Sequence, residues 1–256
     1  MNDYKFIRIA KSPGRFDIIL NHLPVNILTI AMMEEITAGL GEAARDHSLK
    51  ALVFRSEGKH FSAGADVAEH TADKVEAMIG AFGNMFRALA AVPAVTIAVV
   101  DGSALGGGCE LATFCDIVLA SDRAKFGQPE IQLGVFPPVA AVVFPRMMSY
   151  SRALELLITG KIISAAEAQQ FGLINHVWPA AEFVAKAEEL IAGITSLSAT
   201  AIALTKKTLN RTQDLSLTKA LELADEIYLK ELMATQDARE GLAAFLEKRR
   251  PVWKNQ

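Results

Sequence analysis

The stretch Pro93-Ala94-Val95-Thr96-Ile97-Ala98-Val99-Val100-Asp101-Gly102-Ser103-Ala104-Leu105-Gly106-Gly107-Gly108-Cys109-Glu110-Leu111 decides the fold. Its first half is an apolar, β-branched run between a proline and a glycine, which predicts a fully buried strand. The three consecutive glycines that follow allow backbone conformations and close approaches that a Cβ forbids. Helix-compatible residues continue to Phe114. We therefore expect the glycines to stand at a helix N-terminus.

A helix that begins at these glycines offers a candidate oxyanion site. Its first backbone N–H groups lack intrahelical partners, and the helix dipole is positive there. Such a site can receive a carbonyl oxygen that gains negative charge, and Glu110 lies one turn inside the helix. Alternatively, the glycines form only a tight packing turn. The dinucleotide and P-loop patterns both fail, because Leu111 occupies the place of the third glycine and no Gly-Lys-Ser/Thr follows.

Composition limits the class of protein. The chain has 256 residues, a length that fits one large domain or one domain with an appendage, and 51% of them are hydrophobic and 21% charged, which is enough for a sizeable core. A net charge of −3 argues against a general nucleic-acid binder, although a few local cations can still bind an anionic ligand. The start of the chain shows no signal pattern, and no apolar run approaches the about 20 residues that cross a bilayer. We expect a soluble, cytoplasmic protein with no nucleic-acid and no membrane partner.

The two cysteines, Cys109 and Cys115, have no metal-ligand spacing, and we expect both to be reduced. Cys109 could act as a nucleophile only with a paired histidine, and none is identifiable. The five histidines show no metal spacing either, so we predict no metal site and place them on the surface or in loops: His22, His47, His60, His70 and His176. No Gly-x-Ser-x-Gly elbow is present, which disfavours a serine hydrolase.

Strands and helices alternate in the first three quarters of the chain. Strands are expected at 4–9, 16–20, 49–55, 93–100, 116–120 and 173–178. Thr29 can cap a helix, and a long amphipathic helix with an apolar stripe of core residues is expected from Val75 to Leu89. Helices are expected at 151–159 and 165–171, and beyond Pro179 at 180–194, 199–211, 216–234 and 237–248. We place a boundary at this change, between residues 1–195 and residues 196–256.

Two loops and two glutamates form the candidate constellation. Residues 62–66 and 105–108 can each present backbone N–H groups, and Glu110 and Glu130 both lie in glycine-flanked contexts. Two donors and two carboxylates around an apolar pocket can polarise a carbonyl and move protons beside it, as chemistry next to a thioester requires. Each carboxylate alone can equally be a solvated or capping group, and spacing does not place both at one site.

Three segments carry a strong resemblance to the enoyl-CoA hydratase/isomerase (crotonase) family: Phe-Ser-Ala-Gly-Ala-Asp at 61–66, Ala-Leu-Gly-Gly-Gly-Cys-Glu-Leu at 104–111 and Phe-Gly-Gln-Pro-Glu-Ile-Gln-Leu-Gly at 126–134. Residues 153–160, 168–174 and 240–249 resemble it too, in family order and over essentially the whole chain. The resemblance implies an α/β fold, a crotonase-like spiral of ββα repeats with an acyl-CoA site in 1–195. A C-terminal helical trimerisation region follows in 196–256, in a homotrimer or a dimer of trimers.

The resemblance also implies roles for particular residues. The backbone N–H groups of Ala65 and Gly107 would form the oxyanion hole for the thioester oxygen. Glu110 and Glu130 match the two catalytic glutamates of the hydratases, and having both favours water addition or removal. We assign Glu110 as the base that activates water and Glu130 as the acid that protonates carbon, with reversed roles for dehydration. No cofactor is implied, because coenzyme A is part of the substrate.

Contacts to the substrate and to coenzyme A are implied for Val25, Ala63, Ala65, Asp66, Val67, Leu105, Gly107, Phe136 and Pro138. Phe245 and Lys248 match positions that often reach the nucleotide of coenzyme A in a neighbouring subunit, although Lys248 can also be an ordinary solvated lysine. In one departure, a lysine common in mitochondrial hydratases is Ala68 here, so a phosphate contact is missing or supplied elsewhere.

The sequence after Gly134 suggests the acyl group. Most hydratases continue there with a proline and a Gly-Gly-Thr-type helix start, whereas this chain has Val-Phe-Pro-Pro-Val-Ala-Ala at 135–141. The change adds side-chain volume and stiffens the wall of the acyl pocket, unless it is neutral drift. The run looks like that of the family's cyclohexa-1,5-diene-1-carbonyl-CoA hydratases of anaerobic benzoyl-CoA degradation, and we expect that substrate. The alternatives are a short-chain enoyl-CoA hydratase or an enoyl-CoA isomerase of fatty-acid oxidation, and a non-catalytic RNA- or ligand-binding relative.

Overall fold

The computed structural model describes residues 4–256. Residues 1–3, which belong to the N-terminal segment without a signal pattern, lie outside the described residues. Its larger sheet has six strands in the order β1-β2-β3-β4-β6-β9. β1 and β2 form an antiparallel hairpin, and the other neighbours are parallel. The strands are β1 (Ile7–Ser12), β2 (Arg15–Leu20), β3 (Ala51–Ser56), β4 (Val95–Val100), β6 (Ile117–Ser121) and β9 (His176–Trp178).

A second, three-stranded sheet gives the fold its spiral character. It has the order β5-β7-β8, with β5 (Ser103–Leu105), β7 (Lys125–Gly127) and β8 (Ile162–Ser164). β4 of the large sheet is followed at once by β5 of the small one, and β6 is followed by β7. Two successive turns of the chain, β4-β5-α3 and β6-β7, thus each add a strand to both sheets, which agrees with the expected ββα spiral. The three-residue strands were not predicted, because they are too short to show an alternation.

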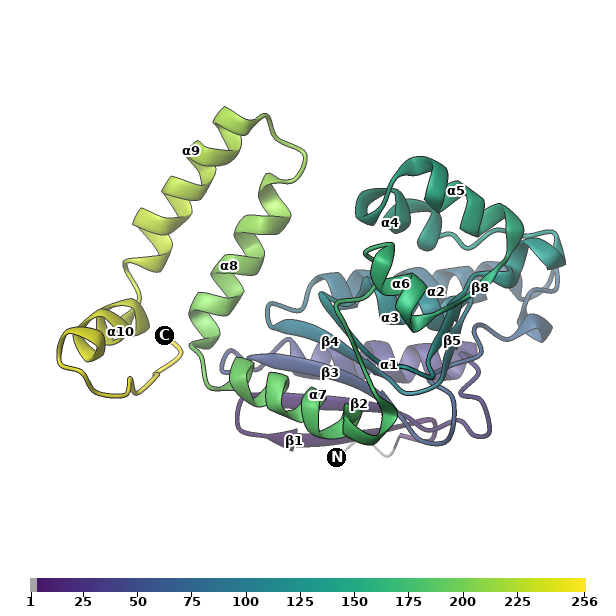
Figure 1. The fold of residues 1–256 in the computed structure, drawn as a ribbon, viewed down its shortest axis with the longest axis horizontal. Coiled ribbons are helices and arrows are strands. Elements are labelled where there is room, and N and C mark those ends of the chain that lie inside the picture. Colours follow the sequence, from purple (N-terminus) through teal and green to yellow (C-terminus); the bar gives the residue numbers. More distant parts are fainter. Residues whose placement is uncertain (1–3) are drawn as a thin grey trace.

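Both faces of the large sheet are covered by helices (Figure 1). In β3, Ala51 and Val53 belong to a buried cluster with α7 (Ala180–Thr195), while Leu52 and Phe54 belong to the main core. The helices α1 (Ile30–Ala43), α2 (Val75–Ala90) and α3 (Gly107–Phe114) pack on this second face. Burial on both faces explains why the central strands β3, β4 and β6 are largely apolar rather than alternating.

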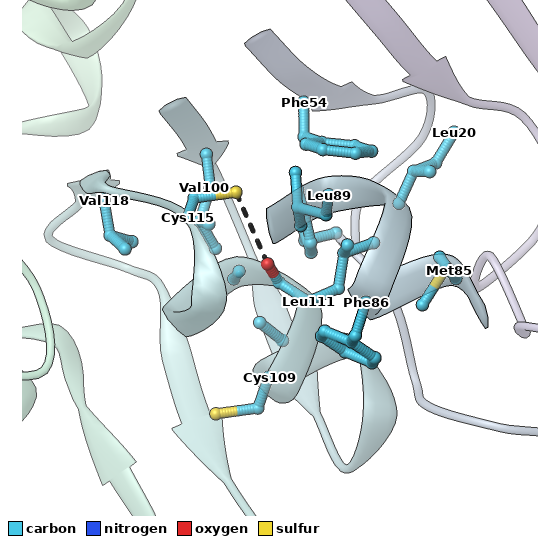
Figure 2. Close-up of a cluster of buried hydrophobic side chains, with 14 of the residues drawn as sticks. Leu20, Phe54, Met85, Phe86, Leu89, Val100, Cys109, Leu111, Cys115 and Val118 are labelled. Carbon is cyan, nitrogen blue, oxygen red and sulfur yellow. Dashed lines mark hydrogen bonds between the residues drawn. The ribbon is translucent and has the colours of Figure 1, made fainter. Parts of the chain in front are cut away.

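The main core contains both cysteines. Cys109 and Cys115 are free thiols buried among apolar side chains of α2, α3 and the strands (Figure 2). The Cys115 Sγ donates to the carbonyl oxygen of Leu111 at 3.4 Å. Burial raises the pKa of both thiols, which keeps them protonated. Both thiols are free in the structure, and their redox state stays a prediction.

The amphipathic helix α2 corrects one expectation. Met78, Phe82 and Leu89 are buried, as the apolar stripe predicts. Val75 and Ile79, however, are 37% and 48% exposed. Both line a cavity, as do the buried Met78 and Phe82, so this part of the stripe faces a pocket as well as the core. An apolar stripe in a sequence does not distinguish a core contact from the wall of a ligand pocket.

The remaining elements of the core connect the two sheets to the C-terminus. η1 (Val67–Glu69) and η2 (Pro129–Leu133) are short 3₁₀ turns that the sequence did not predict. Three short helices lie between β7 and β9: α4 (Ala140–Met147), α5 (Tyr150–Thr159) and α6 (Ala165–Gln170). The side chain of Thr29 caps α1 by accepting from the N–H of Met32, as expected.

The C-terminal helices extend away from the sheets (Figure 1). They are α8 (Ala199–Thr212), α9 (Leu217–Ile227) and α10 (Gln236–Leu246), and a π-helical turn, Tyr228–Leu232, ends α9 earlier than expected. The Lys206 Nζ of α8 donates to Oδ2 of Asp116, the residue before β6, at 2.6 Å. The buried Asp237 accepts from the Ser198 hydroxyl at 2.6 Å. The domain boundary predicted at residue 195 falls between α7 and α8 and stays a prediction.

Among residues 4–256, no single helix is long and apolar enough to cross a membrane. α7 and α8 together reach the required length and composition, but a bend of 97° separates them. The apolar side chains Phe183, Ala187 and Ile191 of α7 are buried against the large sheet, as in the core helix of a globular domain.

Candidate active site

A cavity of about 450 Å³ lies between α2, the start of α3, η2 and the loop after β3. Its lining is mainly apolar, with contributions from Met78 and Phe82 of α2. Phe82 stacks edge-on against Phe86, with ring centroids 4.9 Å apart, so this part of the wall is supported by the core. An apolar cavity with a few convergent polar groups is the usual form of a small-molecule site.

Two backbone amides in this cavity have no acceptor. Within residues 4–256, neither the Ala65 nor the Gly107 N–H donates a hydrogen bond. Gly107 opens α3, where N–H groups lack intrahelical partners. The residues on both sides of Ala65 bond to Leu28, which fixes the loop and leaves the Ala65 amide free. A Cβ placed on Gly107 would lie 3.4 Å from the Ala65 nitrogen, so the two amides are close neighbours.

Two of the glycines are required by close approaches. A Cβ on Gly108 would lie 2.5 Å from the Cβ of Ser62 and 2.7 Å from its carbonyl oxygen. A Cβ on Gly106, whose φ is +52°, would lie 2.6 Å from Oε1 of Glu130. The absence of a side chain at Gly108 lets the two loops meet, and its absence at Gly106 leaves room for the Glu130 carboxyl group. The glycine cluster is thus more than a packing turn.

Glu110 is a buried carboxyl held by the start of a second helix. It is 2% exposed, and its Oε1 accepts from the backbone N–H groups of Val139 and Ala140 at 2.7 and 2.8 Å. These donors belong to the first turn of α4 and have no intrahelical acceptors. Burial, together with the negative charge of Glu130, raises the pKa of Glu110 to about 8, although the two N–H bonds oppose the shift. The other oxygen, Oε2, is left for the cavity.

Glu130 reaches the same cavity from η2. It is half-buried, and burial raises its pKa above the ordinary value. The buried Gln128 lies beside it, and when its amide NH₂ group faces its acceptors it donates at 3.2 Å to both Glu130 oxygens and to the Gly106 carbonyl. The structure therefore brings together the two glutamates and the two amides that the sequence singled out.

Other predicted contact residues divide into two groups. Ala63, Val67, Phe136 and Pro138 line the cavity together with Ala65 and Gly107. Val25, Asp66, Leu105, Phe245 and Lys248 do not line it. Val25 and Asp66 support the loop, since the Val25 carbonyl accepts from the Ala63 N–H at 2.9 Å and Asp66 caps η1. Phe245 and Lys248 lie at the end of α10, where Phe245 is 81% exposed.

His70 is the polar cavity residue that the sequence analysis did not single out. It follows η1 in a loop, as expected of the histidines, but it also lines the cavity. Val75, Ile79, Leu133 and Val135 complete the apolar wall. The position of His70 four residues after Asp66, in the loop of the candidate oxyanion hole, is the signal that could have found it.

Two other chemistries find no support. Cys109 is 1% exposed and does not line the cavity, which argues against its use as a nucleophile. Among residues 4–256, no group of three or more His, Cys, Asp or Glu side chains could hold a metal ion. What the geometry defines is a site that can polarise a bound carbonyl group with two amides and transfer protons with two carboxyls.

Comparisons with known proteins agree with this kind of site. The model of the enoyl-CoA hydratase/isomerase family matches residues 16–256, and the chain belongs to this family. The probable enoyl-CoA hydratase echA8 of Mycobacterium bovis is 40% identical over 230 residues, which cover 89% of each chain. The cyclohexa-1,5-dienecarbonyl-CoA hydratase of Thauera aromatica is 36% identical, over 90% of this chain and 89% of its own.

Solved structures show the same fold. An enoyl-CoA hydratase from Bacillus anthracis superposes with a TM-score of 0.93 at 30% identity, over 98% of this chain and all of the other. Human enoyl-CoA hydratase domain-containing protein 3 gives a TM-score of 0.92 at 31% identity, over 97% of this chain and 100% of its own. The expected crotonase fold is confirmed.

The contact between Gly108 and Ser62 yields a prediction for stability. Gly108→Ala should lower the free energy of unfolding by about 1–3 kcal/mol, because the added Cβ overlaps Ser62 and the loops must separate. The control is Gly80→Ala in α2, where a Cβ meets nothing within 4 Å, and it should instead stabilise by roughly 0.5–1 kcal/mol through helix propensity. Denaturant unfolding measures both, and a stabilised Gly108→Ala variant would contradict the close approach.

Proposed function

We propose that the protein is an enoyl-CoA hydratase, which adds water reversibly to the conjugated double bond of an acyl-CoA thioester. One observation carries the proposal: two amides without acceptors and two carboxyls share one apolar cavity. The family membership and the names of the relatives agree with it. Coenzyme A enters as part of the substrate, and no further cofactor is proposed.

The amides of Ala65 and Gly107 would bind the thioester oxygen. Conjugation makes the far carbon of the double bond electrophilic, and attack by water places negative charge on that oxygen. Two N–H donors stabilise the resulting enolate-like transition state, and losing one such donor typically costs about 3–4 kcal/mol of barrier. Because the cavity is apolar, the hydrogen bonds act in a low dielectric and are strong.

The two glutamates would share one proton. In the free protein Glu110 holds it more strongly than Glu130, because Glu110 is the more deeply buried. This form suits dehydration, in which Glu110 protonates the leaving hydroxyl and Glu130 removes the proton from carbon. Hydration uses the other one-proton form, with Glu110 as base and Glu130 as acid. Both directions need one proton on the pair, as microscopic reversibility requires.

The alternative functions use less of the site. An isomerase moves a proton between two carbons and does not need a second group that activates water. Glu110, which is buried and accepts hydrogen bonds from the Val139 and Ala140 N–H groups, is available for that second role and so favours a hydratase. A non-catalytic RNA-binding relative would not need two carboxyls in an apolar cavity, and the net charge of −3 disfavours it. Hydration of crotonyl-CoA, compared with double-bond migration in a 3-enoyl-CoA and with RNA retention, separates the three.

Replacing either glutamate should abolish most turnover. In Glu110→Gln the amide oxygen can still accept from Val139 and Ala140, so geometry is kept while the base is lost. We expect kcat for crotonyl-CoA hydration to fall by about 10²–10⁴-fold in Glu110→Gln and in Glu130→Gln, while acyl-CoA binding survives. Glu155→Gln, at an exposed site on α5, is the matched control. Near-normal rates in both cavity variants would refute the assignment.

The shared proton predicts a bell-shaped pH profile of kcat/KM. As the pH rises through about 8, the pair loses its last proton and activity falls, because no acid remains. As the pH falls through the raised pKa of Glu130, the pair gains a second proton and no base remains. Initial rates from pH 4 to 10 measure both limbs. A profile that is flat from pH 7 to 10 would contradict the raised pKa of Glu110.

We further propose that the acyl group is cyclic, as in cyclohexa-1,5-diene-1-carbonyl-CoA. Val135, Phe136 and Pro138 form one wall of the cavity, and a stiff wall of this kind suits a flat, compact ring better than a flexible chain. The name of the Thauera aromatica relative supports this substrate. The Mycobacterium bovis relative, at 40% identity, is named only as a probable enoyl-CoA hydratase. An ordinary short-chain enoyl-CoA is the second candidate.

The cyclic substrate predicts a preference that can be measured. We expect kcat/KM for the cyclic dienoyl-CoA to exceed that for crotonyl-CoA by at least about tenfold, a difference of about 1.4 kcal/mol in transition-state binding. Phe136→Ala should reduce this preference by removing part of the wall. A higher kcat/KM for crotonyl-CoA with the unaltered protein would instead indicate the short-chain enzyme.

We also propose that the chain assembles as a homotrimer or a dimer of trimers. An apolar cleft of about 870 Å³ lies between the C-terminal helices and the N-terminal ends of β4 and β6. Large apolar side chains on these helices are exposed, including Leu217, Leu229 and Leu246 at 77%, 68% and 80%. Such patches mark interaction surfaces. Light scattering should give three or six chain masses, and a monomer would overturn the proposal, together with the role of Phe245 and Lys248 at a neighbour's nucleotide.

A further inference from the structure

The cavity contains a third ionisable side chain that the proposed reaction does not use. Among the cavity-lining residues of the described chain, only Glu110, Glu130 and His70 are ionisable. The rest of the lining is apolar side chains and backbone. His70 is half-buried, and the proposed acid–base and oxyanion groups assign it no role.

The imidazole of His70 is fixed by the oxyanion loop. Its Nδ1 lies 2.8 Å from the carbonyl oxygen of Asp66. Because a carbonyl can only accept, Nδ1 carries a hydrogen, and Nε2 is the nitrogen that gains or loses the second proton. Among residues 4–256, no side chain or backbone group pairs with Nε2. Asp66 is itself held, since its N–H donates to the carbonyl of Leu28 at 3.2 Å.

Few other charges act on this imidazole. Glu69, the residue before it, accepts from the Ile30 N–H at 2.7 Å and is thereby engaged with the start of α1. Asp73 and Lys74, next along the loop, are exposed to solvent. In the cavity, the facing groups are the two glutamates, with the Gln128 amide beside Glu130. The positive charge of His70 lowers the pKa of Glu130 and opposes the effect of burial.

Building on the hydratase function, we propose that His70 is a positioning residue of the reaction, whose imidazolium charge keeps the Glu130 carboxylate ionised and so extends activity toward acidic pH. The imidazole takes no part in bond making. It is held at Nδ1 by the loop that carries the Ala65 amide, and it lines the same cavity as Glu130.

The charge acts on one side of the pH profile only. An unperturbed imidazole gains its charge below about pH 6.5 and is neutral near pH 8. Loss of the charge should therefore move the acidic limb of kcat/KM to higher pH and leave the alkaline limb in place. A packing defect would instead lower kcat/KM across the whole range and leave the acidic limb at its original pH.

The experiment compares His70→Met and His70→Gln with the unaltered protein, using crotonyl-CoA. The first variant removes the charge and the hydrogen-bonding groups, and the second retains a donor and an acceptor without a charge. Both should shift the acidic limb to higher pH. His47→Met, at an exposed histidine after α1, is the matched control and should leave the profile unchanged. An acidic limb that stays in place in both His70 variants, or that moves equally in the His47 variant, would overturn the proposal.

A second measurement does not depend on turnover. Infrared difference spectra during a pH titration detect the protonated carboxyl of Glu130 as the band that Glu130→Gln removes. In His70→Met this band should appear at higher pH than in the unaltered protein, and an unshifted band would overturn the proposal. If the unaltered protein hydrates no enoyl-CoA, the hydratase function fails, yet this titration still decides whether His70 acts on Glu130.

Discussion

The close contact between the glycine turn at the start of α3 and the loop after β3 sets the geometry of the site. At Gly108 the two backbones approach until a single Cβ would overlap Ser62. This approach brings the Gly107 amide beside that of Ala65 and leaves both without acceptors. Two parallel strands, β3 and β4, deliver the two loops to the same edge of the large sheet. The pairing of two amides without acceptors is thus a consequence of strand order and of the absence of a side chain at Gly108.

The buried carboxyl of Glu110, next to these two loops, lowers the stability of the folded state when it is ionised. The unfolded chain would ionise Glu110 near its ordinary value of 4.5, whereas the folded chain holds the proton to about pH 8. Folding is therefore opposed progressively by this group as the pH rises from 4.5 to about 8. The N–H groups of α4 reduce the cost without removing it, because they bind one oxygen only. The site retains a poorly solvated acid that a structural role would not require.

The sequence predicted the fold well where patterns were long. The buried strands, α1 with its Thr29 cap and the long helices all follow from apolar runs, periodicity and capping residues. It could not predict β5, β7 and β8, whose pairing depends on distant segments. Glu110 and Glu130 were recognisable by family motifs, but their meeting in one cavity is a tertiary property. The roles of Val139 and Ala140 could not be found at all, because they act through backbone atoms. Val75 and Ile79 misled for a related reason, since an apolar residue has the same pattern in a core and in a pocket.

The way α4 holds Glu110 has a consequence for how such a site can diversify. Val139 and Ala140 donate to Glu110 through their backbone N–H groups, so these hydrogen bonds do not depend on the identity of their side chains. The neighbouring Val135, Phe136 and Pro138 shape the wall of the cavity. Substitutions along this run can therefore remodel the wall of the cavity while the Glu110 carboxyl stays anchored, with proline at 139 or 140 as the exception because it has no N–H. Residues 135–140 thus contribute both to the wall of the cavity and to the anchor of Glu110, and the two contributions can change independently.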